Sequence, residues 1–235
     1  VTASASLGSA SVSASSFDIS GVDSADLTVS GALTVADGSV SVGATDASAS
    51  LDSASVSASS FQVNGVDSAD LTVANDFVMA DSWANVGALA SSVSLGSASL
   101  SGASTFTLFG DDEVSLTVAD ALTMVGASNV SVGAGSGLGN DSGNAENGTG
   151  ASVSLGSLAM TGDQSAETFS SLLVQAGDGG SATTVTTVVG EGVPVTVGNA
   201  GNGGSVSMAV TGTASMDYSD LTVSGGNGGS SDVAD

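Results

Sequence analysis

Apolar residues alternate with small polar ones along most of the chain, in pairs separated by a single residue. Phe17/Ile19, Val40/Val42 and Phe61/Val63 have this spacing, which is the period of two expected of a half-buried β-strand. A glycine follows each pair within two residues. These glycines recur at steps of 22, 22, 22, 23 and 23 residues, at Gly21, Gly43, Gly65, Gly87, Gly110 and Gly133. A strand followed by a turn glycine at a fixed step predicts a repeat architecture.

Each unit of about 22 residues holds three such pairs, which we assign to three sides of a coil. Side one carries Ala5/Leu7, Leu27/Val29, Ala49/Leu51, Leu71/Val73, Val93/Leu95 and Leu116/Val118; side two carries Ala10/Val12, Leu33/Val35, Ala54/Val56, Phe77/Met79, Ala98/Leu100 and Leu122/Met124; side three carries the pairs before the glycines. The pattern predicts an all-β fold: a single-chain parallel β-helix, or β-solenoid, with three short strands per coil and roughly nine coils.

The repeat predicts one solenoid domain over residues 1–224, with two interruptions. The stretch at about 135–150 is rich in Gly, Asn and Ser and reads as a loop insertion, and an irregular patch follows at about 161–171. We expect Val195/Val197 to resume the ladder and Val206/Met208, Ala214/Met216 and Leu221/Val223 to form the last coil. Residues 225–235 have the composition of a flexible tail.

A second period of 44 residues suggests how the interior is filled. Leu7–Val29 and Leu51–Val73 are nearly identical, and they are two glycine steps apart. Alternate coils carry small residues on sides one and two and Phe on side three, whereas the coils between them carry large residues on sides one and two. Because a narrow core must be filled densely, we expect large and small residues to alternate between layers, with the Phe side chains pointing inward.

The charge is entirely one-sided. The chain has 24 acidic residues and no Lys, Arg, His or Cys, which gives a formal net charge of −24. Salt bridges between side chains and disulfides are therefore excluded. Nucleic acid and anionic membrane surfaces are poor partners without basic residues, and no apolar run reaches the length of a transmembrane helix. The start at Val1, without Met or a basic segment, suggests a processed chain or a segment of a longer one.

The corner after the recurring glycine is acidic in several coils, at Asp23, Asp46, Asp67, Asp111 and Asp112. We expect stacking to bring these carboxylates into a ladder along one edge. Repulsion within such a ladder would favour a divalent cation such as Ca²⁺, which takes oxygen ligands. The alternative is that each Asp bonds local backbone amides in its turn. No other cofactor is suggested.

The central residues of side one form a second candidate surface. Ser6, Thr28, Ser50, Thr72, Ser94 and Thr117 are expected to form an outward row of hydroxyls. Regularly spaced hydroxyls suit ice or a crystalline polysaccharide, although Ser and Thr are also ordinary residues on solvated strands.

Catalytic chemistry has few candidate groups in this chain. Without His, Cys, Lys or Arg, only carboxylates and Tyr218 can act as acids or bases, and the densest acidic cluster is Asp111, Asp112 and Glu113. Carboxylates alone serve in glycosidases, but a charged turn explains this cluster equally well. We therefore expect that the protein is not an enzyme.

The units Leu7–Val29, Leu51–Val73 and Leu95–Val118 resemble the repeats of bacterial β-helical surface proteins, namely filamentous-haemagglutinin-like adhesins and autotransporter passengers. The resemblance implies an extracellular rod at the cell surface. It supports a structural protein that stacks head to tail with its own copies into a filament, sheath or surface layer. The alternatives are an adhesin or stalk module that binds surface glycans through the 135–150 insertion, and an ice-binding protein.

Overall fold

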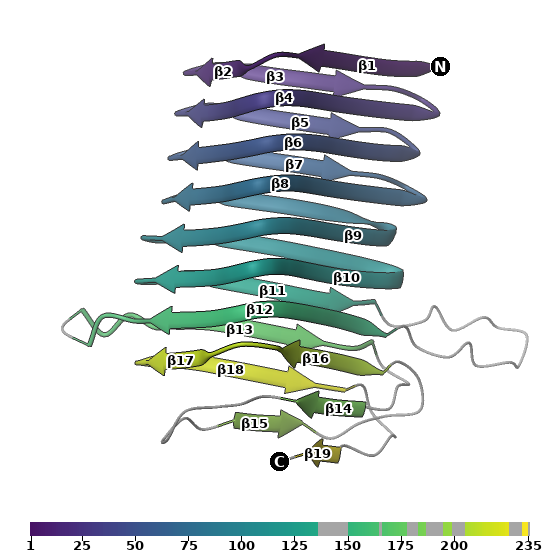
Figure 1. Cartoon of the computed structure of the whole chain (residues 1–235). Helices are drawn as coiled ribbons and strands as arrows, with labels where there is room; N and C mark the ends of the chain where they lie inside the picture. Colours follow the sequence, from purple (N-terminus) through teal and green to yellow (C-terminus); the bar gives the residue numbers. More distant parts are fainter. Residues whose placement is uncertain are drawn as a thin grey trace, which may run out of the picture.

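The computed structural model is a parallel β-solenoid in which the chain winds down a single stack of coils (Figure 1). It describes residues 1–135, 150–164, 166–177, 183–186, 195–198, 205–225 and 232–234. All the strands belong to one continuous sheet, and every pairing between strands is parallel. The predicted fold class is confirmed, with no helix in the described part of the chain. The predicted number of coils was too high, since about six turns of about 23 residues are formed in place of roughly nine.

In the described ranges, nineteen strands make up this sheet. They are β1 (Thr2–Leu7), β2 (Ala10–Ser13), β3 (Ser16–Ser20), β4 (Ser24–Ala36), β5 (Ser39–Gly43), β6 (Asp46–Ser57), β7 (Ser60–Asn64), β8 (Ser68–Ala80), β9 (Trp83–Ser101), β10 (Thr105–Val125), β11 (Asn129–Ala134), β12 (Ala151–Thr161), β13 (Ser170–Gln175), β14 (Thr183–Thr186), β15 (Val195–Gly198), β16 (Val206–Val210), β17 (Ala214–Asp217), β18 (Ser219–Ser224) and β19 (Asp232–Ala234).

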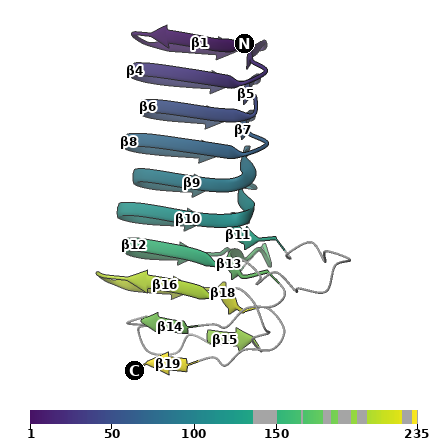
Figure 2. The same ribbon diagram turned by 90° about the vertical axis from the view of Figure 1, so that its right-hand side faces the viewer.

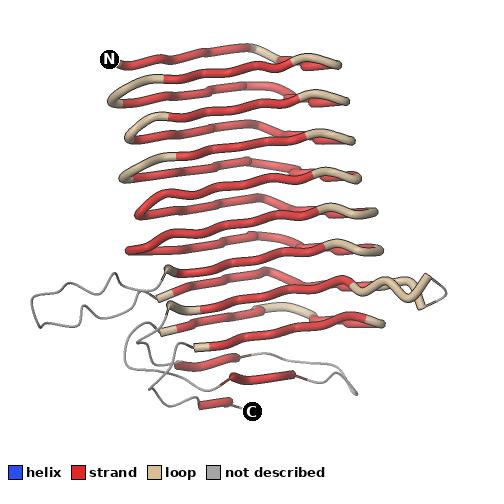
Figure 3. The backbone as a smooth tube through the Cα atoms, turned by 180° about the vertical axis from the view of Figure 1, so that it is seen from behind, coloured by secondary structure: helices blue, strands red, loops and turns tan. Residues whose placement is uncertain are grey.

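Sides one and two are usually one bent strand rather than two. The first coil (β1–β3) and the coil of β16–β18 have three separate strands, whereas β4, β6 and β8 each run through both sides, and β9 and β10 also include a side-three segment (Figure 3). The bend falls at a register shift, for example between Val29 and Ala32 where β4 pairs with β6. Adjacent coils differ there by one residue, which is a β-bulge that turns the strand without ending the ladder.

The core lies inside the coil and follows the predicted alternation. Phe61, Phe77 and Phe106 are buried, and Phe17 in the first coil packs partly against the same core. In register, side three runs Phe17, Val40, Phe61, Ala84, Phe106 and Val130, while side two runs Ala10, Leu33, Ala54, Phe77, Ala98 and Leu122. A large side chain therefore lies beside a small one in most neighbouring layers, and the inward orientation of these rings is confirmed.

The corner between sides two and three contains the tightest turns of the coil. A residue with positive φ recurs there, at Ala14, Asp37, Ala58, Asp81, Gly102, Gly126 and Tyr218. A serine follows within two residues in most coils and turns its hydroxyl inward. Ser82 Oγ lies 2.7 Å from Ala80 O and 3.0 Å from Val56 O, and it accepts the N–H of Ser59 at 3.3 Å. Buried hydroxyls thus satisfy the backbone where the strands end.

The recurring glycine ends side three, but it is not the residue with positive φ. Its role differs from coil to coil. At Gly65 a Cβ atom would lie 1.8 Å from the carbonyl oxygen of Ser68, and at Gly21 it would lie 2.0 Å from that of Ser24. At Gly133 nothing lies within 4 Å of the same atom. Close approach of the backbone, not left-handed geometry, therefore requires glycine at the crowded positions.

Chain order and stacking order differ below β13, contrary to the expected succession of coils. β16 and β17 pair with β12, and β18 pairs with β13, so this late coil stacks directly on the coil of β12 and β13. β14 and β15, which come earlier in the chain, pair with the far edges of β16 and β18 (Figure 2). Within the expected tail, β19 pairs with β14.

Candidate functional site

The five corner aspartates are all exposed. Asp46 N–H donates to the carbonyl oxygen of Asp23 in the adjacent coil at 3.0 Å, but Asp46 lies in register with serines and not with another aspartate. Asp23 accepts the amine of Val1, and Asp46 accepts the hydroxyl of Ser68 at 2.7 Å. The backbone of Asp67 is bonded on both sides: its N–H donates to the carbonyl of Thr45, and its carbonyl accepts the N–H of Ala90. Asp111 and Asp112 lie in β10 at the register shift between Gly110 and Glu113. The carboxylate of Asp111 lies beside Gly135, where a Cβ atom would overlap it.

The register explains why no acidic ladder forms. The neighbours of Asp46 in the adjacent coils are Ser24 and Ser68, and those of Asp70 are Ser48 and Ser92. Because the sequence repeats over 44 residues, equivalent aspartates lie two coils apart, or roughly 9.6 Å. Among the described residues, no group of three carboxylates is placed to hold a metal ion.

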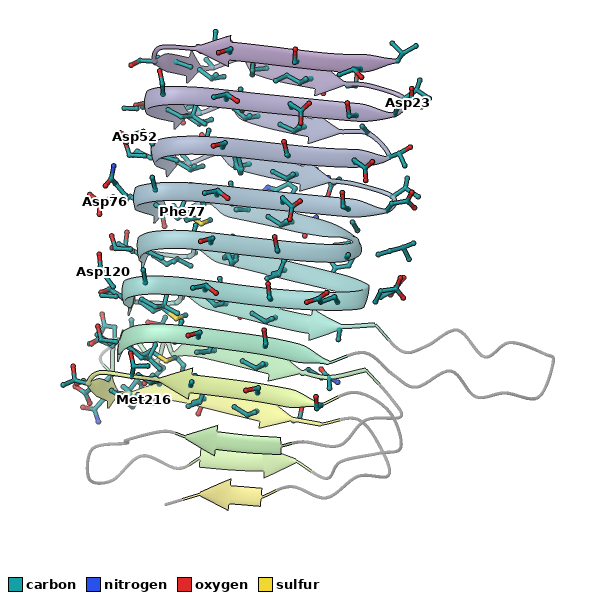
Figure 4. The ribbon with its side chains drawn as sticks, turned by 45° about the vertical axis from the view of Figure 1, so that its right-hand side comes forward. Asp23, Asp52, Asp76, Phe77, Asp120 and Met216 are labelled. Atoms are coloured by element: carbon teal, nitrogen blue, oxygen red, sulfur yellow. The ribbon has the colours of Figure 1, made fainter. Side chains whose placement is uncertain are left out.

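Another acidic edge was not anticipated from the sequence. Asp52, Asp76 and Asp120 lie one below another at the bulge between sides one and two, at the opposite edge from Asp23 (Figure 4). They border a groove of about 380 Å³, in which Asn75 Nδ2 donates to Asp52 Oδ1 at 2.8 Å and Ser97 Oγ to Asp76 Oδ1 at 2.5 Å. The sequence feature that could have revealed this edge is the acidic residue that comes one to three positions after the side-one pair, as at Asp52, Asp76 and Asp120. Neutral donors already occupy two of the three carboxylates.

The hydroxyl row on side one is confirmed as a geometric feature. Ser6, Thr28, Ser50, Thr72, Ser94, Thr117 and Ser154 are exposed and follow one another in register. The parallel outward row is mixed, because Asp26 and Asp70 alternate there with Ser48 and Ser92. Carboxylates hold hydration water strongly, so this second row argues against an ice-like water layer. Ice binding stays a prediction, which a thermal hysteresis measurement would test.

The predicted loop insertion lies largely outside the described residues, which stop at Gly135 and resume at Gly150. The irregular patch is partly described: it leaves β12 after Thr161 and returns at Ser170, with an antiparallel bridge between Asp163 and Thr168. Phe169, within this patch, stacks on Tyr218 of the next layer, with ring centroids 4.5 Å apart. Tyr218 is therefore engaged in packing.

Comparisons with known proteins identify no family for this chain. No protein-family model matches the sequence, and no match is found among curated proteins or solved structures. Of the resemblance of the repeats to bacterial surface proteins, only the β-solenoid fold is therefore supported. Within the described residues, no helix is long and apolar enough to cross a membrane.

Proposed function

We propose that the protein is a structural component of the cell exterior whose solenoids join end to end into a filament, sheath or surface layer. The carrying observation is the incomplete burial of the first coil. Val12 and Ile19 are 8% and 6% exposed, whereas Val35 and Val42, their counterparts one coil further, are both 0% exposed. Leu7 and Phe17 are only partly buried.

The free edge of this coil has the chemistry of a docking surface for another coil. β1 and β2 pair with β4 and β3 pairs with β5, so among the described strands each pairs on one side only. Unpaired backbone groups on the other side favour the addition of further parallel strands. Inside the first coil, Ala5, Ala10 and Phe17 form a layer of two small residues and one large residue. A docking coil with large residues on sides one and two and a small one on side three would fill the space against this layer.

A second copy of the chain is the occupant that we propose. A head-to-tail contact between unlike ends that continues the stack along the solenoid axis does not close into a ring, so it produces a filament rather than a dimer. The charge of −24 opposes association, and salt weakens that repulsion by shortening the Debye length from about 30 Å at 0.01 M to about 3 Å at 1 M. The extracellular location rests on the likeness of the repeats to those of bacterial surface proteins.

The experiment compares the chain with two lysine variants at low and high salt, by negative-stain electron microscopy and sedimentation. Ala5→Lys places a cation in the interior of the first coil, whereas Ser4→Lys adds the same charge on its exposed outer face. We expect filaments of the chain and of Ser4→Lys at about 1 M NaCl, and none of Ala5→Lys. A chain that stays monomeric at every concentration and salt level would contradict the proposal.

A further inference from the structure

One position on side three departs from its row. The first outward residue of this side runs in register through Ser16, Ser39, Ser60, Trp83, Thr105, Asn129 and Ser171. Trp83 is the only large residue in the row and the only tryptophan in the chain. Its side chain is 45% exposed. An indole is thus displayed in a row that otherwise consists of small polar side chains.

A groove of about 320 Å³ lies beside the indole, lined by Gly38, Ala58, Ser59, Ser60, Asp81 and Trp83. It spans three coils, since these residues belong to the corners that precede β5, β7 and β9. Gly38, which lines the groove, must be glycine because a Cβ atom there would lie 2.6 Å from the carbonyl oxygen of Ser15.

The polar groups around the groove differ in availability. Ser59 Oγ is engaged by Ser57 O at 2.5 Å and by the N–H of Gly38 at 3.1 Å. Asp81 accepts the N–H of Ala103 through Oδ1 at 3.0 Å. The hydroxyl of Ser60 makes no hydrogen bond within the described part of the chain. An aromatic face, a free hydroxyl and a carboxylate with one oxygen unused therefore surround one hollow.

We propose that this groove binds a sugar ring of a non-acidic glycan. The apolar C–H face of a pyranose packs against an indole, and its hydroxyls need a few fixed polar groups beside that face. The net charge of −24, with no basic side chain, repels acidic glycans and favours neutral or amine-bearing ones. This binding site is independent of assembly, because it lies on the lateral surface and not at the edge of β1–β3.

Fluorescence of Trp83 reports on the site directly, because no other tryptophan contributes. Cellohexaose, chitosan hexamer and oligogalacturonate serve as neutral, amine-bearing and acidic probes. We expect saturable changes in emission with the first two, at lower concentration for the chitosan hexamer, and none with oligogalacturonate. A change with the acidic probe alone, or with none of the three, would overturn the proposal.

Saturation-transfer NMR then tests variants, since Trp83→Ala removes the fluorophore. We expect Trp83→Ala to weaken binding of the chitosan hexamer at least tenfold and Ser60→Ala to weaken it a few-fold. Phe109→Ala is the matched control, because Phe109 is a similarly exposed aromatic (46%) away from the groove, and its binding should equal that of the unmodified chain. Equal binding by Trp83→Ala, with an unchanged circular dichroism spectrum, would exclude the groove as the site.

Discussion

The ring of Phe77 meets the ring of Phe106 edge to face, with centroids 5.9 Å apart and an interplanar angle of 72°. The two residues come from neighbouring coils and from different sides. Phe77 lies in register with Ala98 on side two, and Phe106 lies in register with Ala84 on side three. Each ring therefore has an alanine in the adjacent coil and meets the other across the interior. The core therefore has a period of two coils, because a large ring in one coil needs a small residue at the same position of the next.

Phe77→Ala should be strongly destabilising. It opens a cavity in a layer whose other members cannot fill it, and it removes the edge-to-face contact with Phe106. We expect a loss of about 3–5 kcal/mol in the free energy of unfolding. Denaturant unfolding followed by circular dichroism measures this loss. Phe109→Ala is the control, with a smaller expected loss because the Phe109 side chain is 46% exposed whereas that of Phe77 is 1% exposed; equal losses in the two variants would contradict the layered packing.

The solenoid and its core could be predicted because they depend on periodicity. Alternation of apolar and polar residues assigned Leu27, Val29 and Phe61 to the interior, and the step of about 22 residues fixed which of them stack. Both inferences use only the spacing of side chains along a strand. The order of the C-terminal layers could not be predicted, because strands pair wherever their apolar pairs match. Leu221/Val223 of β18 pairs with Leu172/Val174 of β13, although Val195/Val197 of β15 comes earlier in the chain and has the same apolar spacing.

The candidate sites were less predictable, for two different reasons. The alternation of Asp46 with Ser24 and Ser68 was present in the sequence as the 44-residue period, yet the acidic ladder was inferred from the shorter period. The corner serines gave no usable signal, because Ser82 is one of many serines and its inward position follows from the positive φ of Asp81. Composition cannot distinguish a buried hydroxyl from a solvated one.

Ser82→Ala should test the role of the buried corner hydroxyls. The substitution leaves the N–H of Ser59 without its acceptor and removes the donor to the carbonyls of Ala80 and Val56. We expect a loss of about 1–3 kcal/mol in the free energy of unfolding, the usual effect of a buried group left unsatisfied. Ser55→Ala, on the exposed face of side two, should change it by less than about 0.5 kcal/mol. Indistinguishable variants would show that water replaces the hydroxyl.

The recurring glycines should respond to substitution according to local crowding. Gly65→Ala forces a methyl group against the carbonyl of Ser68, so the corner must shift; we expect a loss of about 1–3 kcal/mol. Gly133→Ala meets no atom within 4 Å, and we expect a change within about 0.5 kcal/mol. Thermal unfolding of the two variants in parallel measures the difference. If the two substitutions were equally destabilising, backbone geometry rather than steric contact would explain why glycine recurs at these positions.

The corner with positive φ allows the cost of left-handed backbone to be measured in both directions. Ala58 has φ 46°, so Ala58→Gly should raise the free energy of unfolding by up to about 1 kcal/mol. Gly126 has φ 79° and its nearest heavy atom to a new Cβ is 3.4 Å away, so Gly126→Ala should lower it by about 1 kcal/mol. Denaturation midpoints give both values, and shifts of the same sign would contradict the assigned backbone.

Salt should stabilise the chain without any preference for calcium. Twenty-four carboxylates repel one another with no basic side chain to offset them, and NaCl screens this repulsion as its concentration rises from about 0.01 M to about 1 M. We expect the thermal unfolding midpoint to rise by several degrees over that range. Because Asp46 and Asp70 lie between serines and not beside other carboxylates, Ca²⁺ should stabilise no more than Mg²⁺ at equal ionic strength. A calcium-specific rise of more than about 5 °C, reversed by a chelator, would instead require an ion site built from carboxylates that the described coils hold apart.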